Sequence, residues 1–209
     1  MKFLIVDDHA LVRKGLLQIL VEEFPLAEVG EIANGNDVVE EVMKHQWDVI
    51  LLDISMQGKN SIEILKQIRS SGIITPVLMV SMYPEELYAV RALKAGASGF
   101  INKESANEEL LLAVHKVLTG HKYFSPSIGD KLAEKVGENW KKSANEFLSD
   151  REIQVLQLIA RGDSVKEIAS QLSISPATVA TYRVRVLGKL GLKSNVELTQ
   201  YAIHNNLID

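Results

Sequence analysis

Short runs of apolar residues recur along the first half of the chain, and a polar residue closes each of them. The runs are Phe3–Val6, Val49–Leu52, Val77–Val80 and Phe100–Ile101. Continuous apolar runs of this length predict strands that are buried on both faces of a parallel sheet. The residues that close them are Asp7 with Asp8, Asp53, Ser81 and Lys103. Because ligands bind beyond the carboxyl ends of such strands, we expect these side chains to share one site.

Helical patterns separate the predicted strands as far as residue 119. We expect strands near residues 2–7, 28–33, 48–53, 76–81 and 98–102. We expect helices near residues 10–23, 36–45, 61–71, 84–95 and 106–119. Strict alternation of strands and helices predicts right-handed crossovers, and so an α/β unit with a doubly wound, five-stranded parallel sheet over residues 1–119.

Residues 148–209 carry only helical patterns and form a second, smaller unit. The helices are expected near residues 150–160, 165–172, 176–190 and 195–205. Ser149, Ser164 and Ser194 each precede a Glu by three residues, which is the spacing of a capping box. The short connection 173–175 predicts the turn of a helix-turn-helix. Residues 120–147, rich in glycine and mixed charge, are interpreted as a linker with a helical piece near 127–137.

Composition narrows the class of protein. Of 209 residues, 46% are hydrophobic and 24% charged, as in globular proteins. Cysteine is missing, which excludes a disulfide framework and a thiolate metal site. No apolar stretch approaches the ~18 residues of a membrane helix, and the first residues have no secretory pattern. We therefore expect a cytoplasmic protein without membrane contact.

Charge is distributed unevenly between the two units. Residues 1–119 hold 11 basic and 17 acidic residues, whereas residues 148–209 hold 7 basic and 6 acidic residues. No acidic residue lies between Ile168 and Val196, a stretch that contains Arg183, Arg185, Lys189 and Lys193. A local basic stripe on an acidic chain indicates a polyanionic partner for the second unit alone.

The residues at the sheet edge suit phosphoryl chemistry. A carboxylate attacks phosphorus poorly unless a hard cation reduces the charge repulsion, and Mg²⁺ prefers carboxylate oxygens. Asp7 and Asp8 can supply these oxygens beside Asp53. The Lys103 ammonium can offset the remaining phosphoryl charge, and the Ser81 hydroxyl can donate to a phosphoryl oxygen.

These residues resemble the receiver domain of two-component response regulators. The match rests on Leu4–Asp8, Asp53, Ser81 and Gly99–Lys103. The resemblance implies a flavodoxin-like sheet of order 2-1-3-4-5, and Asp53 as the acceptor of a phosphoryl group from a sensor histidine kinase. It implies that Asp8, Asp53 and the Ser55 carbonyl bind Mg²⁺ directly, with Asp7 acting through water. It also makes Ser81 and Phe100 a conformational switch pair.

Other functions stay open at this point. The family usually has proline four residues after the acceptor, where this chain has Gln57. A Mg²⁺-dependent phosphatase of haloacid-dehalogenase type also uses a strand-end Asp and a Lys, but it needs an acid where this chain has Ser55. A phosphorelay module whose helical unit binds a protein is the other alternative. Apart from phosphorylating and dephosphorylating itself, the receiver is not expected to be an enzyme.

The second unit resembles the LuxR-type helix-turn-helix of NarL/FixJ-class regulators. Leu148–Glu152, Lys166–Ala169, Thr178–Val179 and Lys189–Leu192 carry the likeness. It implies a regulator that binds double-stranded DNA, with RNA polymerase as a further candidate partner. The expected DNA-facing residues are Thr178, Ala180, Thr181, Arg183, Val184, Arg185 and Lys189. The family commonly has lysine at position 180 and histidine at 182, where this chain has Ala180 and Tyr182.

The last predicted helix is a candidate surface for homodimer formation after phosphorylation. In the family this helix pairs two helix-turn-helix units, which would place two recognition helices about one DNA turn apart. The candidate residues are Val196, Leu198, Tyr201 and Ala202. The alternative is that this helix packs only on its own unit.

Overall fold

The computed structural model describes residues 1–56, 60–83, 85–125, 128, 148–205 and 207–208. The chain divides into two compact units, Met1–Gly137 and Glu138–Asp209. This division falls inside the predicted linker, while the boundaries at residues 119 and 148 stay predictions. Gln57, most of the linker and, apart from residue 128, the helical piece near 127–137 lie outside the described residues.

The first unit is built on a five-stranded parallel sheet, as the apolar runs predicted. Its order is β2-β1-β3-β4-β5, which confirms the expected topology. Every residue of the two strands β3 and β4 is buried, which explains why these runs do not alternate with polar positions. The strands are β1 (Lys2–Val6), β2 (Glu28–Ile32), β3 (Val49–Asp53), β4 (Val77–Ser81) and β5 (Gly99–Asn102).

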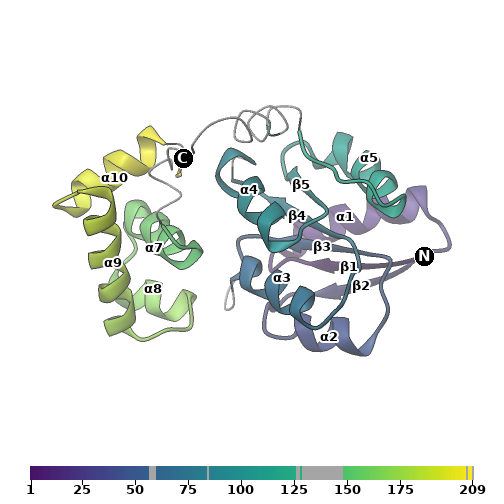
Figure 1. Ribbon diagram of the computed structural model, residues 1–209, viewed down its shortest axis with the longest axis horizontal. Coiled ribbons are helices and arrows are strands. Elements are labelled where there is room, and N and C mark those ends of the chain that lie inside the picture. Colours follow the sequence, from purple (N-terminus) through teal and green to yellow (C-terminus); the bar gives the residue numbers. More distant parts are fainter. Residues whose placement is uncertain (57–59, 84, 126–127, 129–147, 206, 209) are drawn as a thin grey trace. The chain divides into compact units, whose positions relative to one another are not determined.

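Helices cover both faces of this sheet (Figure 1). Alternate residues of β1, Phe3 and Ile5, pack against α1 and α5 in one buried cluster. The helices α2, α3 and α4 lie on the opposite face (Figure 1). The helices of this unit are α1 (Ala10–Glu23), α2 (Val38–Lys44), α3 (Ser61–Ser70), α4 (Glu85–Ala95) and α5 (Ala106–Leu118).

The chain that follows α5 returns to the sheet and runs beside β5. Tyr123 donates its backbone N–H to the carbonyl of Ser98 at 2.9 Å and accepts from the N–H of Phe100 at 2.9 Å. Tyr123 therefore pairs with Gly99 in a parallel bridge. A Cβ atom on Gly99 would lie 2.6 Å from the Tyr123 carbonyl oxygen, so this close approach requires glycine.

Two side chains hold this returning segment on the neighbouring helices. The Tyr123 hydroxyl donates to Glu109 of α5 at 3.0 Å. The backbone N–H of Ser125 donates to Glu85 of α4, also at 3.0 Å. We call residues 121–125 the β5 strap, because they tie the chain that follows α5 to the last strand of the sheet and to the helices on either side.

The second unit contains α7 (Asp150–Arg161), α8 (Val165–Gln171), α9 (Pro176–Leu190) and α10 (Asn195–His204). The capping boxes predicted at Ser149 and Ser164 are complete. At Ser194 the box is only half formed, because Glu197 accepts from the N–H of Lys193 instead of closing back on Ser194. No helix in the described part of either unit combines the length and apolar character needed to cross a bilayer.

Candidate functional site

The carboxyl ends of β1 and β3 bring three acids together. The two strands are neighbours in the sheet, and Asp7 and Asp53 are each only 1% exposed. Ligand atoms of Asp7, Asp8, His9 and Asp53 all lie within 4.8 Å of one another. The expected convergence of the strand-end acids is therefore present, at the topological switch point between β1 and β3.

Lys103 joins this acidic group from the end of β5. Its Nζ lies 2.7 Å from Oδ2 of Asp7 and 3.1 Å from Oδ1 of Asp53, and its side chain is 5% exposed. The backbone N–H of Lys103 donates to the Ser81 carbonyl at 2.7 Å, which fixes the ends of β4 and β5 to each other. The ammonium therefore binds two carboxylates at once in a buried pocket.

Burial dominates the electrostatics of Asp53. It disfavours the charged carboxylate and raises the pKa of Asp53 to about 6, although the Lys103 ammonium opposes this shift. Burial also disfavours the charge on Lys103, but the carboxylates of Asp53 and Asp7 outweigh it and raise the pKa of Lys103. At neutral pH, Asp53 is thus mainly a carboxylate and Lys103 is an ammonium.

One oxygen of Asp53 is held and the other is not. Oδ1 accepts from the N–H of Ser55 at 3.2 Å and faces Lys103. Oδ2 is buried and has no hydrogen-bond partner among the described residues. A buried carboxylate oxygen without a partner is costly, and either a divalent cation or a phosphoryl group beside it would remove that cost. The donor set, mainly carboxylate oxygens, fits a hard cation of this kind.

The predicted switch residues lie on β4 and β5, the two strands that follow β3 in the order of the sheet. The Ser81 hydroxyl is fully buried and accepts from the N–H of Tyr83 at 2.9 Å. Phe100 pairs in register with Met79 of β4 and is 1% exposed, so its ring is turned into the first unit. The roles of Ser81 and Phe100 as a switch stay predictions.

Two residues without a predicted role, His9 and Arg13, contact the acids. His9 donates its backbone N–H to Oδ1 of Asp7 at 2.8 Å, and its Nδ1 lies 2.8 Å from Oδ1 of Asp8. Arg13 donates from Nη1 to the backbone carbonyl of Asp7 at 2.7 Å. The position of His9 directly after Asp7 and Asp8 could have indicated its contact with these acids. Nothing in the sequence pattern indicated the contact of Arg13.

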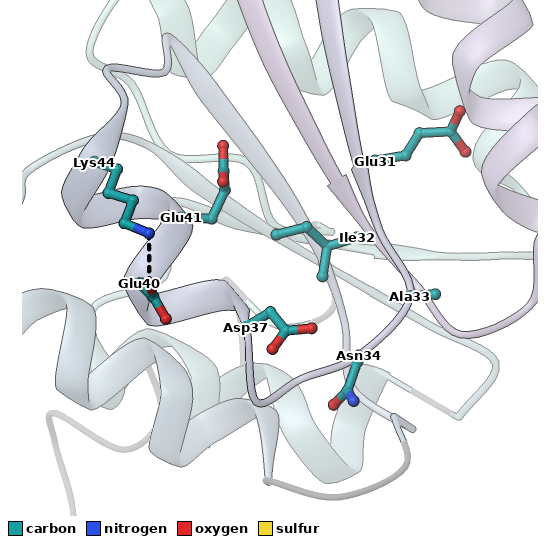
Figure 2. A pocket seen from close by; sticks show the side chains of 8 residues that line it. All are labelled: Glu31, Ile32, Ala33, Asn34, Asp37, Glu40, Glu41 and Lys44. Atoms are coloured by element: carbon teal, nitrogen blue, oxygen red, sulfur yellow. Dashed lines mark hydrogen bonds and ion pairs between the residues drawn. The ribbon is translucent and has the colours of Figure 1, made fainter.

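A pocket of about 420 Å³ between the end of β2 and α2 is separate from this chemistry. Figure 2 shows its lining, in which Lys44 is bound to Glu40. The pocket contains none of the residues around Lys103 and offers mainly carboxylates, so it does not suit a phosphoryl group. Its lining residues are Glu31, Ile32, Ala33, Asn34, Asp37, Glu40, Glu41 and Lys44.

In the second unit, α8 and α9 form the expected helix-turn-helix. The turn between them places Ser173 at φ 54°, and Ser175 caps α9 by accepting from the N–H of Thr178 at 3.1 Å. Val179 and Val186 are fully buried, which fixes the inner face of α9. The opposite face is exposed and carries Ala180, Thr181, Val184, Arg185 and Gly188.

Two of the cations expected to face DNA already have partners inside the unit. Lys189 Nζ lies 2.6 Å from Oε2 of Glu152, whose side chain is 3% exposed. Arg183 donates from Nε to Oδ1 of Asn195 at 2.6 Å. Of the predicted basic contacts on α9, Arg185 instead lies with its guanidinium carbon 6.0 Å from the Tyr182 ring centre.

The dimer surface predicted on α10 needs a correction. Leu198 and Ala202 are completely buried, so they belong to the core of their own unit and are not available to a second copy. Val196 is 67% exposed and Tyr201 is partly buried. Ile203, one residue beyond the predicted set, is 57% exposed and lies two turns after Val196 on the same side of the helix.

Comparison with known proteins agrees with both halves of this description. Residues 3–115 match the family described as "Response regulator receiver domain". Residues 146–202 match the family described as "Bacterial regulatory proteins, luxR family". These matches favour the regulator over the phosphatase alternative, since this family consists of DNA-binding response regulators and not of dedicated enzymes.

Full-length relatives have the same organisation. The chain is 37% identical to the oxygen regulatory protein NreC of Staphylococcus carnosus, with 100% of both chains covered. It is 35% identical to the response regulator UvrY of Escherichia coli, over 98% of this chain and 94% of the relative. Among solved structures, RcsB from Salmonella enterica serovar Typhimurium, bound to promoter rprA with phosphomimetic BeF₃⁻, has a TM-score of 0.65 and 25% identity, covering 96% and 98% of the two chains. This chain therefore belongs to the NarL/FixJ class of response regulators, in which a receiver domain is joined to a LuxR-type DNA-binding domain.

Proposed function

We propose that Asp53 accepts a phosphoryl group from a sensor histidine kinase and that this modification controls binding of the second unit to double-stranded DNA. The main support for this proposal is the difference in surroundings between the two oxygens of the Asp53 carboxylate. Lys103 holds Oδ1 at 3.1 Å, while Oδ2 has no hydrogen-bond partner among the described residues. A nucleophilic oxygen is thus left available in a pocket that also contains a fixed positive charge.

The transfer needs one bond to form and one to break. Asp53 Oδ2 attacks phosphorus, the bond from phosphorus to the histidine nitrogen of the kinase breaks, and an acyl phosphate forms on the carboxylate. Lys103 is placed to offset the charge on the phosphoryl oxygens, and Ser81 lies on the adjacent strand, where its hydroxyl can donate to one of them. This is mainly a matter of position and electrostatics, as loose phosphoryl transfer requires.

Asp7, Asp8, Asp53 and the Ser55 carbonyl are the proposed ligands of Mg²⁺. Their carboxylate donors converge within 4.8 Å, together with His9. When bound, Mg²⁺ would supply the positive charge that lowers repulsion between the carboxylate and the phosphoryl group. Lys103 stays tied to Asp7 and keeps the remaining carboxylate oxygens oriented toward this point.

On the second unit, α9 is the proposed recognition helix. Its exposed face fits a major groove about 12 Å wide because its side chains are small. Arg185 is the proposed phosphate contact, and Arg183 and Lys189 join it only if their links to Asn195 and Glu152 open. Val196 and Ile203 are the proposed contacts between two copies on DNA, with Leu198 and Ala202 supporting them from the core.

The coupling between the units is proposed to be a population shift. Phosphorylation stabilises one receiver state relative to the other. It can change the DNA affinity only by as much as it shifts the equilibrium between these two states. Because the proposed partner is chromosomal DNA, the protein is proposed to act in the bacterial cytoplasm, with RNA polymerase as a further proposed partner at promoters.

The acceptor is tested by labelling the full chain with a radioactive small-molecule phosphodonor and Mg²⁺. Wild type should take up one acid-stable, base-labile phosphoryl group, and Asp53→Asn should take up none. Asp48→Asn is the matched control, since Asp48 lies before β3 and contacts the N–H of Lys2. Equal labelling of Asp53→Asn and wild type would end the acceptor proposal.

The DNA function is tested on the same preparations. Fluorescence anisotropy with random-sequence duplexes should show binding that weakens as salt increases and strengthens after phosphodonor treatment. Asp53→Asn should bind with no response to the donor. Binding that is independent of salt, or missing in all conditions, would favour the alternative in which the helical unit binds a protein.

A further inference from the structure

The outward face of α9 has an apolar centre. Val184 is 64% exposed, although no packing requires a branched apolar side chain there. Ala180 lies one turn before it and is also exposed. An exposed valine on an otherwise polar surface needs no explanation by itself, but this one lies at the middle of the face that the proposed function assigns to the major groove.

The polar side chains on the same helix are engaged within the unit. The Thr181 hydroxyl donates to the carbonyl of Ala177 at 3.0 Å. The hydroxyls of Ser175 and Thr178 lie 2.8 Å apart, and Ser175 also accepts the Thr178 N–H as the helix cap. The first two turns of α9 thus have no side chain that offers the paired donor and acceptor with which Asn or Gln reads adenine.

The basic side chains of α9 are also unsuited to the centre of the groove. Arg183 is bound to Asn195, and Lys189 is bound to the buried Glu152. Arg185 follows Val184 directly, so it points about 100° away around the helix and toward the rim of the face. Charged side chains therefore lie around the rim of this face. The side chains at its centre can make mainly apolar contacts with the edge of a base.

We infer that Val184, with Ala180, reads the C5-methyl groups of thymine in the major groove. This inference rests on the proposed function and adds to it the class of sequence that is recognised. Thymine presents a methyl group beside its O4 acceptor, and it is the only one of the four bases that offers apolar contact in that groove. The two side chains are separated by a rise of about 6 Å along the helix. Adjacent bases are about 3.4 Å apart along a strand, so the methyl groups are expected about two positions apart in each half-site.

The test begins by selecting tight-binding duplexes from a random library with the full chain and a phosphodonor. In the best duplex, each thymine of a half-site is then replaced singly by uracil, which removes the methyl group and leaves base pairing unchanged. The affinity of wild type should fall about fourfold at each contacted position, as expected from the burial of one methyl group. Thymines outside the half-sites serve as controls and should be insensitive to this replacement.

Val184→Ala identifies the residue responsible. Because the side chain is exposed, the fold should be retained, which circular dichroism and the melting temperature check. The variant should bind the thymine duplex more weakly and lose the difference between thymine and uracil at one position of each half-site. Val21→Ala, the same change at an exposed position of α1, should keep that difference.

Each outcome is decisive. Specific, salt-dependent binding by wild type that is unchanged by uracil at every position would overturn the inference while leaving the proposed DNA function intact. Sensitivity to uracil that persists in Val184→Ala at all positions would also overturn it, because another side chain would then contact the methyl groups. Failure to bind any duplex would instead count against the proposed function itself.

Discussion

The Lys103 ammonium lies 3.1 Å from Oδ1 of Asp53 and 2.7 Å from Oδ2 of the neighbouring Asp7, so it bridges the two carboxylates. Two buried carboxylates thus share one counter-charge. Lys103 therefore stabilises the structure of the pocket, in addition to its proposed role of offsetting phosphoryl charge. The effects of mutations in the pocket should reflect this shared counter-charge.

Replacing Lys103 by Met should therefore destabilise the first unit. Removing one partner of a buried ion pair costs about 3–5 kcal/mol. The loss should be smaller at pH 5 than at pH 7.5, because protonation of Asp53 relieves the repulsion between the two acids. Urea denaturation at both pH values measures this, with Lys14→Met on α1 as an exposed control. An equal loss at the two pH values would contradict the assignment.

Asp53 itself should make the protein less stable as the pH rises. Its pKa is about 6 in the folded chain and 3.8 in the reference state, so folding opposes its ionisation. The penalty is missing below about pH 4, grows between pH 4 and 6, and reaches about 3 kcal/mol above pH 6. Asp53→Asn should remove it. The stability of Asp53→Asn relative to wild type, measured without metal, should increase over this range; a difference that is constant from pH 4 to 7 would refute the prediction.

Mg²⁺ should stabilise wild type by binding the folded acids. At a concentration ten times the Kd, the gain is about 1.4 kcal/mol. Asp8→Asn should lose most of this gain, because it removes one of the converging carboxylates. Thermal denaturation with and without Mg²⁺ is the measurement. Asp37→Asn is the control, since Asp37 lines the separate acidic pocket of Figure 2, and it should respond to Mg²⁺ as wild type does.

A pair of glycine variants tests the β5 strap. Gly99→Ala would place a methyl group 2.6 Å from both the Tyr123 carbonyl oxygen and a methyl of Leu78, and should cost about 1–3 kcal/mol. Gly15→Ala meets nothing within 4 Å and lies inside α1, so it should stabilise by about 0.5–1 kcal/mol. Hydrogen exchange should locate the effect of Gly99→Ala at the Phe100 amide, whose acceptor is on the strap. Unchanged protection there would argue against the strap.

Two cations of α9 should behave differently on DNA. Arg185→Ala should lower the slope of log affinity against log salt by about 0.9, the value for one lost phosphate contact. Lys189→Met should leave that slope unchanged and instead lower stability by about 0.5–1 kcal/mol, because Lys189 is bound to Glu152 and is partly exposed. Salt titrations of duplex binding and thermal melts separate the two cases, and a reduced slope for Lys189→Met would reverse the assignment.

The sheet and the acid pocket were accessible from sequence because a single rule controls both. Apolar runs such as Val49–Leu52 fix which residues are strands, and the carboxyl ends of parallel strands meet at one edge. Asp53 and Lys103 could therefore be placed together although 50 positions separate them in the chain. The order of the strands came from the family resemblance and not from the runs themselves.

Contacts that depend on the packing of one helix against another could not be predicted from the sequence in this way. On α10, apolar residues occur at both Leu198 and Val196, and periodicity alone does not say which side faces inward. The link between Lys189 and Glu152 joins residues 37 positions apart, and a lysine on a helix gives no sign of such a partner. Basic residues on α9 consequently looked alike in the sequence but have different partners.

The β5 strap has a practical consequence for domain-exchange chimeras. The match to the receiver-domain family ends at residue 115, before the chain returns and Tyr123 pairs with Gly99. A junction placed directly after α5 would graft foreign residues onto the edge of β5 and remove the anchors on Glu85 and Glu109. A transplanted receiver should therefore carry its own residues through Ser125, so that the backbone partner of Phe100 travels with it.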